Sequence, residues 1–158
     1  MNKTVKIAIA LVICLMVGYS ASVVTRPSVE TWYPTIIKPS FNPPNWIFMP
    51  VWTLLYICMA VAAGLVWDKI KEQNEEVKKA LGFFLIQLTL NAIWSYIFFG
   101  LKNPMLAFIE IALLWLFIYE TYFKFVKINK IAGYLLIPYM AWVAFAGILN
   151  ASIWWLNR

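Results

Sequence analysis

The sequence predicts an all-α integral membrane protein, a bundle of five transmembrane helices with an ordered loop rich in proline and tryptophan between the first two. Hydrophobic residues make up 63% of the 158 residues and charged residues only 13%, which is far from the composition of a soluble domain. Five apolar runs each approach the roughly 20 residues that cross a bilayer. Because little polar material remains outside these runs, residues 1–158 are expected to form a single domain.

The first apolar run, residues 5–25, follows Lys3 and Lys6. A basic start and small residues near its end are also typical of a cleavable signal peptide. The apolar character continues through Val23 and Val24, however, which makes the run long enough for a span. We therefore expect a retained helix.

The stretch from Trp32 to Tyr56 carries an unusual density of aromatic residues and prolines. Proline removes a backbone donor and restricts φ, so most of the segment 27–45 is not expected to form regular helix or sheet. We interpret the segment as an ordered, aromatic lid over a membrane-embedded mouth. Aromatic anchoring at the bilayer interface is the simpler alternative.

The second expected span covers residues 47–67. Within this approximate range the helix itself is expected to start near Met49, with Pro50 in its first turn, where proline is tolerated. The segment Asp68–Lys79 that follows is the most polar part of the chain. It is predicted to be a solvated connection with continuing helical turns.

The remaining expected spans are residues 80–101, 104–125 and 131–156. Asn103 and the proline after it mark a short turn between the third and the fourth. Within the fifth, Pro138 should kink the helix or open a gap in its hydrogen bonds.

Basic residues are distributed unequally between the two ends of such a bundle. Nine of the 13 lysines and arginines lie on the side of the N-terminus and four on the other side. The positive-inside rule then places the N-terminus in the cytoplasm, and the first loop and the C-terminus outside. Because these charges form no continuous stripe, nucleic acid is not an expected partner.

Several classes of site are excluded by composition. The chain has no histidine, which excludes Ser-His or Cys-His catalysis, histidine zinc sites and histidine-ligated haem. Cys14 and Cys58 both fall inside apolar runs, so neither a structural disulfide nor a metal cluster is expected. We expect no metal site and no required cofactor.

Three of the expected spans carry stripes that mix aromatic rings with small or hydrogen-bonding groups on one helix face. The stripes are Trp52 and Tyr56 on the second span, Asn91, Trp94, Ser95 and Phe98 on the third, and Trp142, Ala146, Leu149 and Asn150 on the fifth. If they converge, they form an apolar pocket with a few polar groups, which is the usual form of a small-molecule site. Helix packing alone is the alternative, because small residues and amides are common between membrane helices.

Two further features of the spans concern packing and charge. Glu110 is the deepest acidic residue, and an ionisable group in a membrane is a candidate functional group. Its nearness to the start of the fourth span favours a structural role instead, since the helix dipole favours an anion there. The small residues Ala60 and Gly64, and likewise Gly147 and Ala151, could let helices approach closely within a monomer or across a dimer.

The sequence resembles the translocator protein family, whose members are also called tryptophan-rich sensory proteins or peripheral-type benzodiazepine receptors. Three blocks carry the resemblance: Trp32–Tyr56, Gln87–Gly100 and Leu135–Asn157. The resemblance implies a five-helix bundle, often dimeric, in a bacterial cell membrane. It also implies a pocket under the first loop that binds porphyrins, sterols and synthetic ligands of the isoquinoline-carboxamide or benzodiazepine type.

Carried over motif by motif, the resemblance predicts twelve ligand-binding residues. They are Tyr33, Pro43, Trp46, Trp52, Tyr56, Asn91, Trp94, Ser95, Phe98, Trp142, Ala146 and Leu149. The cholesterol-recognition pattern of animal members is broken here, because Ala151 stands where its tyrosine would align; such patterns are weak in any case.

The expected function is that of a membrane receptor or carrier that binds protoporphyrin IX and similar flat apolar ligands, with a sensory or transport role. Without histidine, a metal-free porphyrin fits better than haem. The enzymatic alternative is light-dependent porphyrin degradation, with Trp52 and Trp142 as candidate catalytic residues because indole can donate an electron to a photoexcited ring. Sterol or lipid binding and a regulatory partner role are further alternatives. The expected partners are the porphyrin, membrane lipid and a second copy of the chain.

Overall fold

The computed structural model describes residues 1–158, and all of its regular secondary structure is helical. Five helical segments are long and apolar enough to cross a membrane, which confirms the predicted five-span class. The elements are α1 (Lys3–Thr31), η1 (Tyr33–Thr35), α2 (Asn45–Asp68), η2 (Lys69–Lys71), α3 (Asn74–Ser95), the π-helical η3 (Tyr96–Gly100), α4 (Pro104–Ile128), α5 (Lys130–Tyr134) and α6 (Ile137–Leu156).

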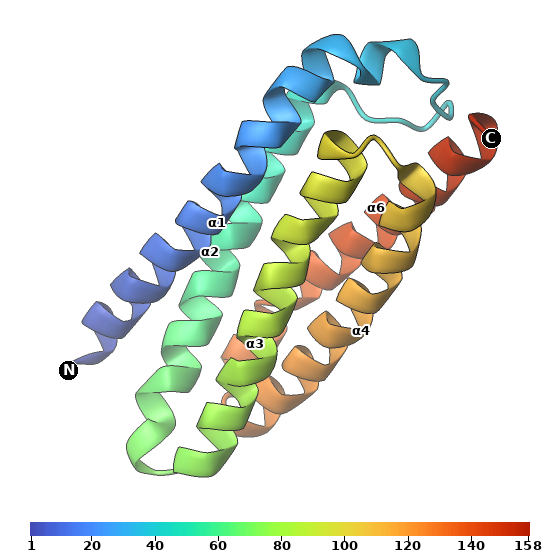
Figure 1. Cartoon of the computed structure of the whole chain (residues 1–158). Coiled ribbons are helices and arrows are strands. Elements are labelled where there is room, and N and C mark those ends of the chain that lie inside the picture. The colour runs from blue at the N-terminus through green and yellow to red at the C-terminus, as the bar shows by residue number, and fades with distance from the viewer.

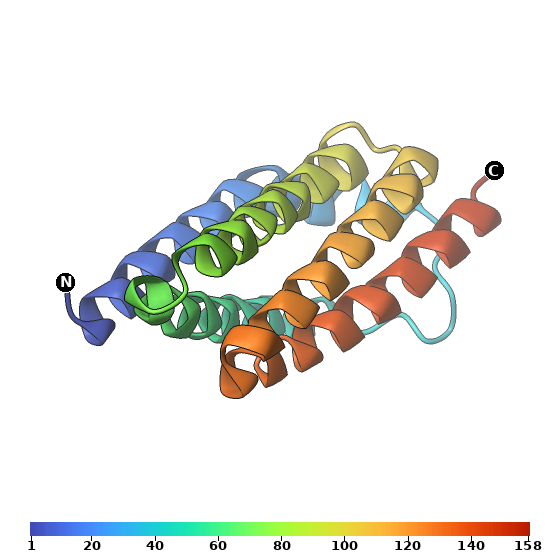
Figure 2. The same ribbon diagram turned by 90° about the horizontal axis from the view of Figure 1, so that it is seen from below.

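The long helices run up and down through one bundle (Figure 1). Helix α1 packs against α2 and α3, α4 packs against α3 and α6, and α2 contacts α5 and α6. The N-terminus lies at one end of the bundle with the α2–α3 connection. The α1–α2 loop lies at the other end with the C-terminus. Figure 2, turned by 90°, shows the same loop reaching across to the end of α6.

Helix α1 is longer than predicted, because it continues through Pro27 to Thr31. Residues 27–31 are therefore helical, and the expectation that residues 27–45 are mostly irregular is wrong for this part of the segment. Proline removes a single donor, and the following groups still find partners. The Trp32 N–H donates to the Ser28 carbonyl oxygen at 2.9 Å, and Thr31 Oγ1 donates to the Pro27 carbonyl oxygen at 2.7 Å. The chain then forms η1 before it becomes irregular.

Helix α2 begins at Asn45, earlier than the expected start near Met49. Pro50 therefore lies inside the helix rather than in its first turn. The missing Pro50 N–H removes the hydrogen bond to the carbonyl of Trp46 only. That loss falls in the second turn, close to the helix start, where the first N–H groups already lack intrahelical partners.

The last span is interrupted, as predicted from Pro138. Helix α5 ends at Tyr134, and α6 begins at Ile137, with Pro138 in its first turn. Between α4 and α5 the chain leaves the helical conformation at Asn129 alone. Asn129 Oδ1 accepts a hydrogen bond from the Ala132 N–H at 3.1 Å, which caps the short helix.

Helices α1 and α2 pack closely against each other at Gly64. Ala60 is fully buried in α2, and the backbone of Ile7 lies directly against Gly64. The Ala60 and Gly64 pair thus permits close packing within the monomer. A side chain at position 64 would separate the two helices.

Replacing Gly64 with alanine is expected to lower the free energy of unfolding by about 1–3 kcal/mol, because overpacking forces side chains and backbone to shift. A Cβ atom at this position would lie 2.7 Å from Ile7 Cα. Thermal unfolding in detergent measures the change. Gly82→Ala is the matched control, because nothing lies within 4 Å of a Cβ atom there and alanine is the better helix former. Equal destabilisation of both variants would contradict the close α1–α2 packing.

Candidate functional site

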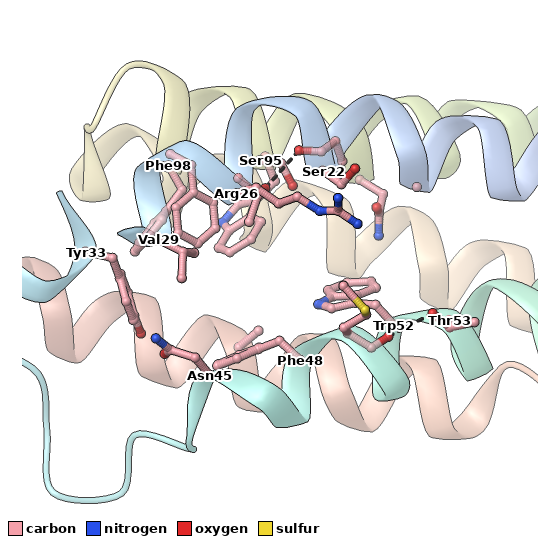
Figure 3. A pocket seen from close by; sticks show the side chains of 18 of the residues that line it. Ser22, Arg26, Val29, Tyr33, Asn45, Phe48, Trp52, Thr53, Ser95 and Phe98 are labelled. Carbon is pink, nitrogen blue, oxygen red and sulfur yellow. Dashed lines mark hydrogen bonds between the residues drawn. The ribbon is translucent and has the colours of Figure 1, made fainter. Parts of the chain in front are cut away.

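A cavity of about 480 Å³ lies inside the half of the bundle nearest the α1–α2 loop. Helices α1, α2, α3 and α6 supply its walls, with Tyr33 of η1 and Phe98 and Phe99 of η3 at one end (Figure 3). Sixteen of the 26 lining residues are hydrophobic. Volume and lining both match the usual form of a small-molecule site.

The structure brings ten of the twelve predicted site residues to this cavity. They are Tyr33, Trp52, Tyr56, Asn91, Trp94, Ser95, Phe98, Trp142, Ala146 and Leu149. The three stripes therefore converge, which is the condition under which the sequence predicts a pocket. This convergence is a statement about geometry, and ligand binding by these residues stays a prediction.

Pro43 and Trp46 do not line the cavity. Trp46 is 73% exposed on the outside of the bundle. The reason is helical phase, because α2 already includes Trp46, and six residues at 100° each turn it well away from Trp52. Asn45 and Phe48 take its place on the cavity face. Their spacing of seven and four residues before Trp52 is the signal that could have found them.

A chain of three hydrogen bonds begins at the cavity wall, where Tyr56 and Asn91 lie, and continues into the core behind it. Tyr56 Oη donates to Asn91 Oδ1 at 2.6 Å, and Asn91 Nδ2 donates to Tyr139 Oη at 2.9 Å. Tyr139 Oη then donates to Gln87 Oε1 at 2.7 Å. All four residues are buried, and they join α2, α3 and α6. The bonds hold Asn91 in one orientation and satisfy both its oxygen and its amide group.

Two of these residues, Gln87 and Tyr139, lie behind the cavity lining and hold residues that line it, and they were not predicted. Gln87 lies four residues before Asn91, so the stripe on α3 could have been extended back to it. Tyr139 follows Pro138 at the break in the last span. Its position depends on where that break falls, and no local pattern indicates it.

Two further hydrogen bonds connect Trp94, on the α3 wall of the cavity, through Asn150 to the first residue of α4. Trp94 Nε1 donates to Asn150 Oδ1 at 3.0 Å, and Asn150 Nδ2 donates to the Pro104 carbonyl oxygen at 2.7 Å. The ring of Trp94 also stacks on Phe98, with centroids 5.1 Å apart. The Trp94 indole is therefore fixed at both its face and its N–H.

Trp142 on α6 differs from Trp94 in one respect. Its Nε1 atom is buried and has no hydrogen-bond partner. The ring packs edge-on against Phe48, with centroids 6.0 Å apart. Since Trp142 lines the cavity, its indole N–H is available to an acceptor on a bound molecule. A buried donor without a partner is costly, so an acceptor there would contribute to affinity.

The loop between α1 and α2 is ordered by its own contacts. Tyr33 Oη donates to Asn42 Oδ1 at 2.7 Å, and burial raises the pKa of Tyr33 to about 12. Lys38 Nζ donates to the carbonyl oxygens of Tyr33 at 2.7 Å and Ile36 at 2.9 Å. The Asn157 side chain beyond α6 bonds both the N–H and the carbonyl of Ile37. The loop is thus tied to the C-terminal end of the bundle above the cavity.

Glu110 lies outside the cavity lining, buried in α4 with 8% of its surface exposed. Neither carboxyl oxygen has a hydrogen-bond partner. The expected stabilisation by the helix start is not supported by any bond to a first-turn N–H. Glu120, in contrast, forms an ion pair with Lys124, at 3.1 Å.

Replacing Glu110 with leucine is expected to raise the free energy of unfolding by about 1–3 kcal/mol, because a buried polar group without hydrogen bonds is destabilising. Thermal unfolding in detergent provides the measurement. Glu120→Leu serves as control and should change stability by less than about 1 kcal/mol, since the pair that it breaks is exposed. A loss of stability in the Glu110 variant would show that its carboxyl group makes a favourable interaction.

With this geometry in place, the comparison with known proteins is informative. The sequence matches the TspO/MBR family over residues 10–156. The chain belongs to this family. The resemblance inferred from the three sequence blocks is thereby confirmed.

Members of the TspO/MBR family from all three domains of life are similar to this chain along most of its length. The tryptophan-rich protein TspO of Chlorobaculum tepidum is 42% identical over 158 residues, covering 99% of both chains. Its namesake from Archaeoglobus fulgidus is 38% identical, covering 96% of this chain and 97% of the relative. The translocator protein of Bos taurus is 33% identical, covering 89% and 83%. Family membership and five membrane-spanning helices identify an integral membrane protein.

Proposed function

We propose that this protein is a membrane receptor or carrier that binds protoporphyrin IX and similar flat, apolar molecules in the cavity beneath the α1–α2 loop. The observation that carries the proposal is the convergence of aromatic rings from α2, α3 and α6 on one cavity of about 480 Å³. Flat conjugated molecules stack favourably on such rings. A sensory or transport role is in keeping with relatives named tryptophan-rich sensory protein and translocator protein.

The test is titration of the detergent-purified protein with protoporphyrin IX in the dark, followed by tryptophan quenching. We expect saturable binding that Trp52→Ala weakens about tenfold, because the substitution removes a stacking ring. Trp46→Ala is the matched control, since Trp46 lies on the same helix but outside the cavity. Its affinity should equal that of the wild type. Absence of saturable binding, or equal effects of the two substitutions, would overturn the proposal.

Light-dependent degradation of the bound porphyrin is a second candidate function. It is favoured by the position of two indole rings, Trp52 and Trp142, at the cavity wall, since indole can donate an electron to an excited ring. Illumination of the complex should then bleach the porphyrin. Trp52→Phe or Trp142→Phe should retain binding and lose bleaching. Bleaching that is unchanged in both variants would contradict a role for these tryptophans.

We also propose that the N-terminus faces the cytoplasm and that the α1–α2 loop faces outward. The support is the excess of basic residues at the N-terminal end of the bundle, nine against four. Single cysteines are placed in the α1–α2 loop, and their labelling in intact cells tests this orientation. Labelling only after cell lysis would reverse it.

A further inference from the structure

Charge is scarce at the cavity and confined to one helix. Among the 26 lining residues only Arg26 and Glu30 are charged, and both lie on α1 near the end below the loop. The Arg26 side chain extends from α1 into the space on the side of the cavity where Trp52 lies (Figure 3). Arg26 is exposed, but its guanidinium group borders an apolar cavity, where an anion can pair with it more strongly than in bulk water.

Arg26 has no such anion within the chain. The four ion pairs of the protein join Lys6 to Asp68, Lys69 to Glu72, Lys78 to Glu75, and Lys124 to Glu120. Glu30 is one turn from Arg26 but does not come within ion-pair distance of it. The guanidinium group therefore retains its donors for a molecule in the cavity.

Several other hydrogen-bonding groups of the cavity are already bonded within the protein. The Tyr56 hydroxyl and both ends of the Asn91 amide are already bonded to protein atoms, as is the Asn150 amide. The buried Trp142 Nε1–H, however, has no acceptor. Arg26 and Trp142 are thus free donors on two different walls, and the complementary ligand carries acceptors.

We infer that Arg26 binds an acid group of the ligand, so that the cavity selects flat apolar molecules with a carboxylate at their edge. This inference rests on the proposed function. Guanidinium and carboxylate match in shape and form paired, charge-assisted hydrogen bonds. The apolar body of the ligand would lie against Trp52 and the rings beyond it.

The position of Arg26 suits an acid group. It lies five residues before the end of α1 at Thr31, or about 7.5 Å at the helical rise. The lining residues Tyr19 and Met49 are exposed on the outside of the bundle, so the cavity reaches the membrane-facing surface between α1 and α2. A carboxylate held here stays near the polar membrane boundary while the rings are buried.

The inference separates two ligands that differ only in charge. Protoporphyrin IX carries two carboxylates, and its dimethyl ester has the same ring system without them. Titration of both in the dark, with tryptophan quenching as readout, should show that the wild type prefers the acid. Arg26→Gln should weaken binding of the acid about tenfold, the range of one charge-assisted contact at a partly exposed site. Affinity for the ester should stay unchanged, which also shows that the variant is folded.

Two further variants sharpen the test. Arg26→Lys keeps the charge but not the paired geometry, and it should retain part of the preference for the acid. Arg158→Gln removes an arginine at the same end of the bundle, outside the cavity lining. This control should leave both affinities unchanged, which excludes a general effect of surface charge.

Each contrary result has a defined meaning. If Arg26→Gln weakens the acid and the ester equally, Arg26 only packs against the rings, and the inference is wrong. If neither affinity changes, the side chain extends to lipid headgroups, and the inference is again wrong. In both cases saturable binding by the wild type leaves the proposed function intact. If the wild type binds neither compound, the proposed function and the inference fall together.

Discussion

An Asn91→Leu variant is expected to lose about 3 kcal/mol of unfolding free energy, because it breaks a buried polar chain at its centre. Leucine has a similar volume but neither donates nor accepts. The Tyr56 hydroxyl, which donates to Asn91 Oδ1 at 2.6 Å, would be left in the core without an acceptor. The Tyr139 hydroxyl would lose one of its two partners and keep Gln87. Thermal unfolding in detergent measures the loss.

The decisive comparison is the double variant Asn91→Leu with Tyr56→Phe. Removing both partners of a buried hydrogen bond costs less than removing one, because no polar group is left unsatisfied. The double variant should therefore be more stable than Asn91→Leu alone. Thr89→Val on the same helix is the control, since its hydroxyl bonds only to the Leu85 carbonyl oxygen and is exposed. Strictly additive losses would contradict a coupled chain.

Replacing Lys6 with methionine is expected to destabilise the protein by about 2–3 kcal/mol. Lys6 Nζ lies 3.0 Å from Asp68 Oδ1, and the two side chains are 7% and 35% exposed. Removing one partner of a fully buried pair costs about 3–5 kcal/mol. The expected loss is smaller here because solvent reaches Asp68. The pair joins the first turns of α1 to the last turn of α2. Its loss should therefore weaken the packing of the N-terminal end of α1 against α2.

The same measurement on Lys69→Met provides a control within the same end of the bundle. Lys69 pairs with Glu72 at 3.1 Å on the surface, and exposed pairs of this kind contribute less than about 1 kcal/mol. A charge-exchanged variant, Lys6→Asp with Asp68→Lys, should recover part of the lost stability. Equal losses for Lys6→Met and Lys69→Met would show that the buried pair has no special role.

Residues inside continuous helices could be predicted as site residues from their spacing. Asn91, Trp94 and Ser95 lie on one face of α3, whose register is unbroken, so their relative directions follow from 3.6 residues per turn. Trp46 and Pro43 could not be predicted in this way. They lie where the loop becomes α2, and a start at Asn45 instead of Met49 changes which side chains share a face.

Family resemblance compensated for part of this limit, but it does not place every residue at the cavity. It supplied Tyr33, which no periodicity indicates and which does line the cavity. It also supplied Trp46, which the structure places on the outside of the bundle. A motif records which residues occur together along the chain. It does not record on which side of a helix each one lies.

The sequence by itself determined the membrane class, the five spans, the polar stripes and the break before Pro138, because composition, run length and periodicity are local properties of the chain. Only the tertiary structure decided which polar groups are already bonded and which remain free. The Asn91 amide accepts one hydrogen bond and donates one, whereas Glu110 and the Trp142 N–H have no partner. Arg26 faces the cavity without an anion. Such pairings depend on how each helix is rotated against its neighbours, and local periodicity does not encode that rotation.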